Sequence, residues 1–190
     1  QRQMCIRDRI DAPKAASILR NRKGVGEAEL GLANEMAINQ FIAHHSVIFQ
    51  PEKKRMWVST APWQCGKYVA YDLNRIFSDS IDFNHEIYTE NLTVPADSFL
   101  QQQEYQQLMT YKRLAPVLRK QIKKKERLDE QTLHAFQHAN PHFFYVYELL
   151  GDYYHATGQQ DKALRNWKKA LLLPIPKRSE SERIEHKINN

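Results

Sequence analysis

The stretch Asn34–Phe77, NEMAINQFIAHHSVIFQPEKKRMWVSTAPWQCGKYVAYDLNRIF, is the part of this 190-residue chain that has the pattern of a β-sheet. Alternation and β-forming residues predict strands over 40–49, 56–60 and 67–73. Pro51 and the charges after it predict a turn, so the first two strands should be antiparallel. A few strands with two open edges do not form a stable sheet alone. We therefore expect this meander to be the edge of a larger sheet or to be covered by helices.

Helical patterns occur on both sides of this stretch. Asp11 can cap a helix that has Pro13 in its first turn and that ends near Gly24. Arg20 lies towards the C-terminal end of that helix, where the helix dipole favours cations. Residues 78–96 have no sustained period and predict an extended surface connector. Further helices are predicted after it: a long one from Asp97 to about residue 125, a short one capped by Asp129 and ended by Asn140-Pro141, two at 143–157 and 159–172, and a frayed polar tail at 179–190.

The hairpin 144–175 resembles one tetratricopeptide repeat, because its large and small residues stand at the spacing of that motif. The small residues should lie where two helices cross closely, and Gly158 should turn the chain. Such repeats normally stack in threes or more, and no second clear copy precedes this one. We interpret the hairpin as docked on its own sheet domain, and a peptide-binding groove is the alternative. The predicted packing residues are Tyr147, Leu150, Gly151, Tyr154, Ala163, Trp167 and Ala170.

Composition adds limits but no activity. The formal net charge is +6. The sequence has no run of 18 apolar residues, so no membrane span is expected in it. The segment 1–9, QRQMCIRDR, resembles translated adapter sequence, so we expect a non-native end and exclude it from fold reasoning. Cys65 is then the only credible cysteine, and no disulfide or cysteine-based metal site is expected. Any targeting signal would lie upstream, so the sequence does not distinguish a cell-envelope from a cytoplasmic location.

Three groups of residues are candidates for chemistry. His44 and His45 are adjacent, so on a strand they would point to opposite faces and could not chelate one metal ion. Cys65 follows Trp63 and Gln64, and a structural thiol is favoured over a nucleophile because only Lys67 is near in sequence to lower its pKa. The other histidines show no metal-ligand spacing, and no metal site or cofactor is predicted. A basic cluster suits a solvated helix face, with nucleic acid or an anionic membrane surface as the alternatives: Lys112, Arg113, Arg119, Lys120, Lys123, Lys124, Lys125 and Arg127.

The central stretch also has a family resemblance. The pattern AHHSVIF–P–––––WVST–PWQ–G–YVAYDL, from Ala43 to Leu73, is similar to the C-terminal part of the C45 autoproteolytic acyltransferase/hydrolase family. Members resemble acyl-CoA:6-aminopenicillanic acid acyltransferase and are N-terminal-nucleophile (Ntn) hydrolases. The resemblance covers about residues 18–77, and bacterial members tend to carry a helical, repeat-like tail.

The resemblance implies an αββα sandwich and a cysteine nucleophile that self-cleavage frees at a new N-terminus. That cysteine would lie upstream, so no catalytic residue is assigned here. His44, His45, Trp63 and Gln64 become candidates for the wall of a substrate pocket. The implied activity is an amide-bond hydrolase or acyltransferase, in which this chain alone is inactive. The implied partners are the remainder of the parent chain and a small amide or acyl-CoA-type substrate, without nucleic acid.

These interpretations combine into an α+β prediction with four parts after the excluded end. Residues 10–77 would be the C-terminal part of an Ntn-hydrolase-like domain and 78–96 a connector. Residues 97–175 would be an all-α region with the repeat-like hairpin, and 176–190 a polar tail. The alternative function is a non-catalytic interaction module that binds a protein or peptide through the hairpin.

Overall fold

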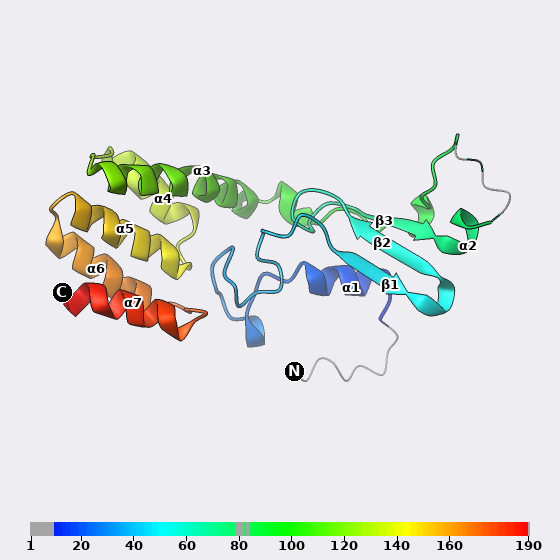
Figure 1. The fold of residues 1–190 in the computed structure, drawn as a ribbon, viewed down its shortest axis with the longest axis horizontal. Helices are drawn as coiled ribbons and strands as arrows, with labels where there is room; N and C mark the ends of the chain where they lie inside the picture. The colour runs from blue at the N-terminus through cyan, green and yellow to red at the C-terminus, as the bar shows by residue number, and fades with distance from the viewer. Residues whose placement is uncertain (1–9, 79–81, 83, 190) are drawn as a thin grey trace. The chain divides into compact units, whose positions relative to one another are not determined.

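The computed structural model describes residues 10–78, 82 and 84–189. The predicted adapter-derived end, 1–9, lies outside the described residues, as do four positions of the predicted connector (79–81 and 83). The described chain is mixed α+β, with one three-stranded antiparallel sheet and several helices (Figure 1), which confirms the predicted class. It divides into two compact units. The sheet unit comprises the described residues up to Asn21 and Phe41–Leu100, and the helical unit comprises Arg22–Gln40 and Gln101–Asn190.

The sheet consists of β1 (Val47–Gln50), β2 (Arg55–Ser59) and β3 (Tyr68–Asp72) in the order β1-β2-β3, both pairs antiparallel as expected. The turn after β1 is the short 3-10 helix Pro51–Lys53. The prediction of a strand from residue 40 is wrong for its first half. Phe41 has a left-handed φ of 54°, which interrupts an extended backbone, and its side chain is only 1 % exposed.

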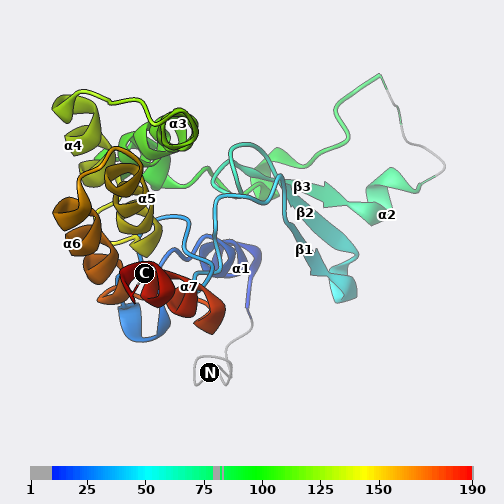
Figure 2. The same cartoon turned by 60° about the vertical axis from the view of Figure 1, so that its left-hand side comes forward.

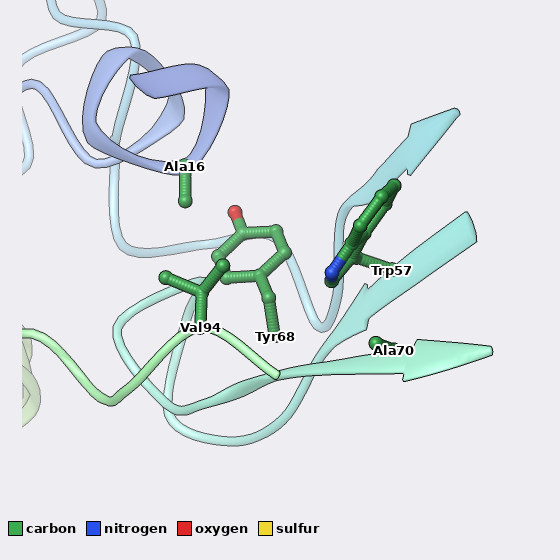
Figure 3. Close-up of a cluster of buried hydrophobic side chains, with 5 residues drawn as sticks. All are labelled: Ala16, Trp57, Tyr68, Ala70 and Val94. Atoms are coloured by element: carbon green, nitrogen blue, oxygen red, sulfur yellow. The ribbon is translucent and has the colours of Figure 1, made fainter. Parts of the chain in front are cut away.

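The two faces of the sheet carry different sets of residues. Ile48, Trp57 and Ala70 form one cross-strand row, and α1 (Ala12–Leu19) covers this face. Figure 3 shows Ala16 of α1 directed at Tyr68, with Trp57 and Ala70 beside it. This buried cluster is the core of the sheet unit.

The ends of α1 follow their local chemistry. The Asp11 carboxylate accepts the backbone N–H of Lys14 at 2.9 Å, so the predicted cap is present. The helix ends at Leu19 rather than at Gly24. After β3 comes the short helix α2 (Leu73–Ile76), capped by Asp72.

The end of the predicted connector belongs to the sheet unit. Val94 forms an antiparallel bridge with Tyr68, and Thr89 donates its backbone N–H to Ala70 O at 2.8 Å. A 3-10 turn, Glu90–Leu92, lies between these contacts. The segment predicted as a surface connector therefore covers the outer edge of β3.

The described part of the helical unit has five α-helices: α3 (Gln103–Lys124), α4 (Glu130–Ala139), α5 (Phe144–Ala156), α6 (Gln160–Leu171) and α7 (Arg178–Asn189). They follow one another in an antiparallel stack (Figures 1 and 2). Helix α5 packs against α3, α4 and α6, and α7 packs against α6. Asp129 caps α4 as predicted, with its carboxylate 2.7 Å from the Thr132 backbone nitrogen. Two 3-10 turns, Val25–Glu27 and Ser98–Gln101, complete the described elements.

The prediction of a frayed tail is wrong. Helix α7 has one fully buried residue, Ile184, and its Arg183 and Lys187 form ion pairs with Glu148 of α5. The mostly polar sequence of α7 does not predict this packing, because one apolar residue and two charged residues hold the helix against α5 and α6.

The loop 22–40 is part of the helical unit, which departs from the predicted 10–77 domain. The Asn140 side chain accepts the Leu32 backbone N–H at 2.9 Å and donates to the Leu32 carbonyl at 2.7 Å. Gly31 has a φ of 77°, and a Cβ there would lie 2.5 Å from the Phe143 backbone nitrogen. These contacts join residues more than 100 positions apart, so local sequence patterns do not reveal them.

Candidate functional site

The loop between β2 and β3 holds an unusual backbone. Trp63 and Gln64 are consecutive non-glycine residues with positive φ, 42° and 70°. Such conformations cost energy and cluster at functional sites and ligand clamps. A Cβ at Gly66 would lie 2.2 Å from Ala61 O, so the loop can close only with glycine at that position.

Arg20 of α1 holds this loop in place. Its Nε donates to Gln64 O at 3.1 Å, and its Nη2 donates to Gly66 O and to Pro95 O, both at 2.8 Å. The guanidinium also lies 5.1 Å from the centre of the Tyr68 ring. The sequence analysis placed Arg20 only as a cation favoured by the helix dipole and did not predict these contacts. The planar guanidinium instead donates to three carbonyls from distant segments.

The Gln64 side chain lies inside this arrangement. The residue is 9 % exposed, and its Oε1 has no hydrogen-bond partner among the described residues. A buried acceptor without a donor is uncommon in folded proteins. It is a polar atom that a ligand or a further segment of polypeptide could satisfy.

A second polar group lies at one end of the sheet, where Ser46, just before β1, meets Ser59 of β2 and Tyr68 of β3. The Ser46 backbone N–H donates to Ser59 Oγ at 2.7 Å, and the Ser46 and Tyr68 hydroxyls are hydrogen-bonded. Burial raises the pKa of Tyr68, which the Ser46 hydrogen bond and the charge of Arg20 only partly offset. The hydroxyl therefore stays protonated and can donate at neutral pH. The neighbouring Cys65 thiol is fully buried.

The four predicted pocket residues lie in two places. Trp63 and Gln64 are adjacent in the loop, and Trp63 makes an edge-to-face contact with Phe41, with ring centres 6.2 Å apart. His44 and His45 are both exposed, and neither makes a hydrogen bond or ring contact with another described residue. The expectation that the two imidazoles point to opposite faces of a strand is wrong, because residues 41–46 do not form a strand.

The repeat-like residues lie in the helical unit, where α5 and α6 cross. Trp167 approaches Gly151 so closely that a Cβ on the glycine would lie 2.3 Å from Trp167 Cδ1. Tyr147, Leu150, Ala163 and Ala170 are buried with them, whereas Tyr154 is half-buried. The hairpin thus brings its small residues to the crossing point.

The basic cluster lies on α3 and the turn after it. Arg119 lies 5.5 Å from the Tyr145 ring centre and donates to the Tyr145 hydroxyl at 3.3 Å. Burial lowers the pKa of Lys112. The remaining six side chains are exposed: Arg113, Lys120, Lys123, Lys124, Lys125 and Arg127.

Within the described residues, no group of three or more His, Cys, Asp or Glu side chains could hold a metal ion. No helix in the described part of the chain is long and apolar enough to cross a membrane. Comparisons with protein-family models, with curated proteins and with solved structures find no match to this chain.

Replacing Gly66 by alanine should destabilise the sheet unit by about 2 kcal/mol, because a Cβ would overlap backbone atoms that cannot move aside. Urea unfolding followed by tryptophan fluorescence measures this, since Trp57 and Trp63 both report on the unit. Lys67→Ala, at the exposed neighbouring position, is the control and should leave the midpoint unchanged. An unchanged midpoint for Gly66→Ala would show that the loop has room to adjust.

Proposed function

We propose that this chain is the C-terminal part of an Ntn-type amide-bond hydrolase or acyltransferase, and the second face of its sheet is the observation that supports this most. Val47, Val58 and Val69 form one cross-strand row on that face. Phe49, Met56 and Tyr71 form the next. None of these six side chains is buried, and Phe49 is 66 % exposed.

An antiparallel sheet with one face in water normally places polar residues on that face. Here both faces are apolar, and α1 covers only one. An apolar sheet face that is not buried among the described residues suits a second sheet packed about 10 Å away. Among the described residues β1 pairs only with β2, so its outer edge is also open to a further strand. The helix α1, the observed sheet and a second sheet packed on its other face would be three of the four layers of an αββα sandwich.

The chemistry proposed for the whole protein does not use a nucleophile from this chain. An upstream cysteine, freed by self-cleavage, would attack an amide or thioester carbonyl, with its own α-amino group as the base. Trp63 and Gln64 would contribute to the wall of the substrate pocket, where the unsatisfied Gln64 Oε1 can accept a hydrogen bond. No cofactor is required by this mechanism.

Expression of the complete gene tests the proposal. The product should separate into two fragments cut immediately before a cysteine upstream of residue 10, and intact mass with N-terminal sequencing locates the cut. A Cys→Ala variant at that position should remain one chain. The present 190-residue chain should show neither cleavage before Cys65 nor amide hydrolysis. A full-length product that is never cut, or fragments split at Cys65, would contradict the proposal.

An interaction module is the second candidate, and the order of helix contacts favours it. Helix α5 contacts both helices of the preceding pair, and α7 lies against α6 as the first helix of a following pair would. The complete gene separates the candidates. Three or more repeats without an upstream cleavable cysteine would support the interaction module.

A further inference from the structure

Two histidines of α4 lie together on its exposed side. His134 and His138 are four residues apart, so they share one helix face. Their rings stack with centres 3.7 Å apart and an interplanar angle of 26°. Both residues are exposed. The sequence-based prediction gave these histidines no metal-ligand spacing and did not consider them as a pair on one helix face.

The protonation of one ring can be assigned from its partner. His138 Nδ1 lies 2.9 Å from the backbone oxygen of His134. A carbonyl oxygen can only accept, so Nδ1 carries the hydrogen and the neutral ring keeps its lone pair on Nε2. Metal-binding histidines use the same arrangement, in which one ring nitrogen donates to a carbonyl and the other binds the ion.

The second ring is also available. His134 makes no side-chain hydrogen bond with another described residue, and no ion pair holds it. Because χ2 of histidine is broad, small rotations of two stacked rings can direct one nitrogen of each towards a common point. The sites available to an ion are thus two imidazole nitrogens on adjacent helical turns.

We propose that His134 and His138 form a two-imidazole site for a late first-row divalent metal ion such as Zn²⁺, Ni²⁺ or Cu²⁺. Imidazole suits these ions, whereas Mg²⁺ and Ca²⁺ prefer oxygen ligands. Water completes the coordination shell, consistent with the lack of a third His, Cys, Asp or Glu ligand among the described residues. This site is independent of the function proposed above.

Zinc titration of the untagged 190-residue chain by calorimetry, in a buffer that does not chelate metals, tests the site. One Zn²⁺ should bind per chain, and Mg²⁺ should not compete. His134→Gln and His138→Gln should each weaken binding by more than tenfold, since loss of even an outer-shell partner costs about 10–100-fold. His85→Gln removes an imidazole from the sheet unit and should leave the affinity unchanged. Both α4 positions are exposed, so the variants should keep the helical circular dichroism of the parent.

A spectroscopic readout distinguishes the pair from other histidines. A long-range proton–nitrogen spectrum should show His138 protonated on Nδ1 before metal is added, and Ni²⁺ should broaden the ring signals of His134 and His138 first. The proposal is overturned if Zn²⁺ does not bind, or if the affinity survives both α4 substitutions. It is equally overturned if the affinity is lost instead when His44 and His45 are replaced.

Discussion

Replacing Gly151 by valine should destabilise the helical unit by about 3 kcal/mol, because the helices cross with no room for a side chain. A Cβ alone would lie 2.3 Å from Trp167 Cδ1 and 2.4 Å from Trp167 Nε1. Trp167 cannot simply rotate away, since it is 2 % exposed and its Nε1 donates to Asp152 at 3.0 Å. The two methyl groups of valine make the overlap larger.

Gly151→Ala gives a sharper test, because two effects oppose each other. Alanine in place of glycine within a helix ordinarily gains about 0.5–1 kcal/mol. Here the overlap with Trp167 should reverse that sign and give a net loss of about 1–2 kcal/mol. Thermal unfolding followed by near-ultraviolet circular dichroism measures both variants.

Two controls identify the cause of the loss. Gly158→Ala has open space around its Cβ but a φ of 77°, so it measures backbone strain without a steric clash. Gly151→Ala combined with Trp167→Leu should cost less than the sum of the two single changes, because leucine removes the clashing atoms. Strict additivity would mean that the glycine and the tryptophan do not share the crossing point.

Local chemistry accounts for most of what the sequence predicted correctly. Asp11 and Asp129 cap helices because a short carboxylate reaches a backbone N–H three residues on. The hairpin around Gly158 follows from a residue that tolerates positive φ. Strands β2 and β3 follow from short runs rich in β-branched and aromatic residues.

The failures concern contacts between distant segments. Arg20 bonds to carbonyls 44, 46 and 75 positions away, and Asn140 bonds to Leu32 across 108. No local pattern marks such pairs. Residues 40–46 alternate like a strand but have no partner strand, since Phe41 turns the backbone and is buried. Tertiary context, rather than propensity, decides that segment.

Removing both cations that face Glu148 should destabilise the helical unit more than removing Glu148 itself. The Glu148 side chain is 2 % exposed, and Arg183 donates to it through Nε and Nη2, each at 2.8 Å. Lys187 Nζ lies 2.8 Å from the same carboxylate and also reaches Asp152. Arg183→Ala with Lys187→Ala would leave a buried charge without a partner, at a cost of about 3–5 kcal/mol.

The Glu148→Gln variant should be less destabilised, because it leaves no buried charge without a partner. Arg183 and Lys187 are 46 % and 26 % exposed, so both can reach water, and Lys187 keeps Asp152. Glutamine conserves the volume and can accept one hydrogen bond. The expected loss is about 1.5–3 kcal/mol, typical of a hydrogen bond to a charged group. A loss as large as that of the double variant would contradict this expectation. It would mean that the attraction between the carboxylate and the two cations, rather than the cost of leaving the carboxylate unpaired, accounts for the loss in the double variant.

The pH dependence separates these variants further. Burial alone would raise the pKa of Glu148, but the hydrogen bonds and charges of Arg183 and Lys187 outweigh it, and the pKa lies below its ordinary value. A carboxyl with a depressed pKa stabilises the fold above its unfolded pKa of about 4.3, and this contribution disappears as the pH falls through the folded value. The Glu148→Gln variant has no carboxylate at this position, so its free energy of unfolding should fall less than that of the parent as the pH is lowered.

In the double variant the pKa of Glu148 should shift in the opposite direction. Without Arg183 and Lys187, burial should raise the pKa of Glu148 above its unfolded value, so the penalty should shrink as the pH falls and the carboxyl protonates. Urea unfolding between about pH 4 and about pH 7 measures the slopes. The informative quantity is the difference between the double variant and the parent, which should narrow towards low pH. A constant difference would mean that Glu148 stays ionised in water, and hence that α7 has left the surface of α5.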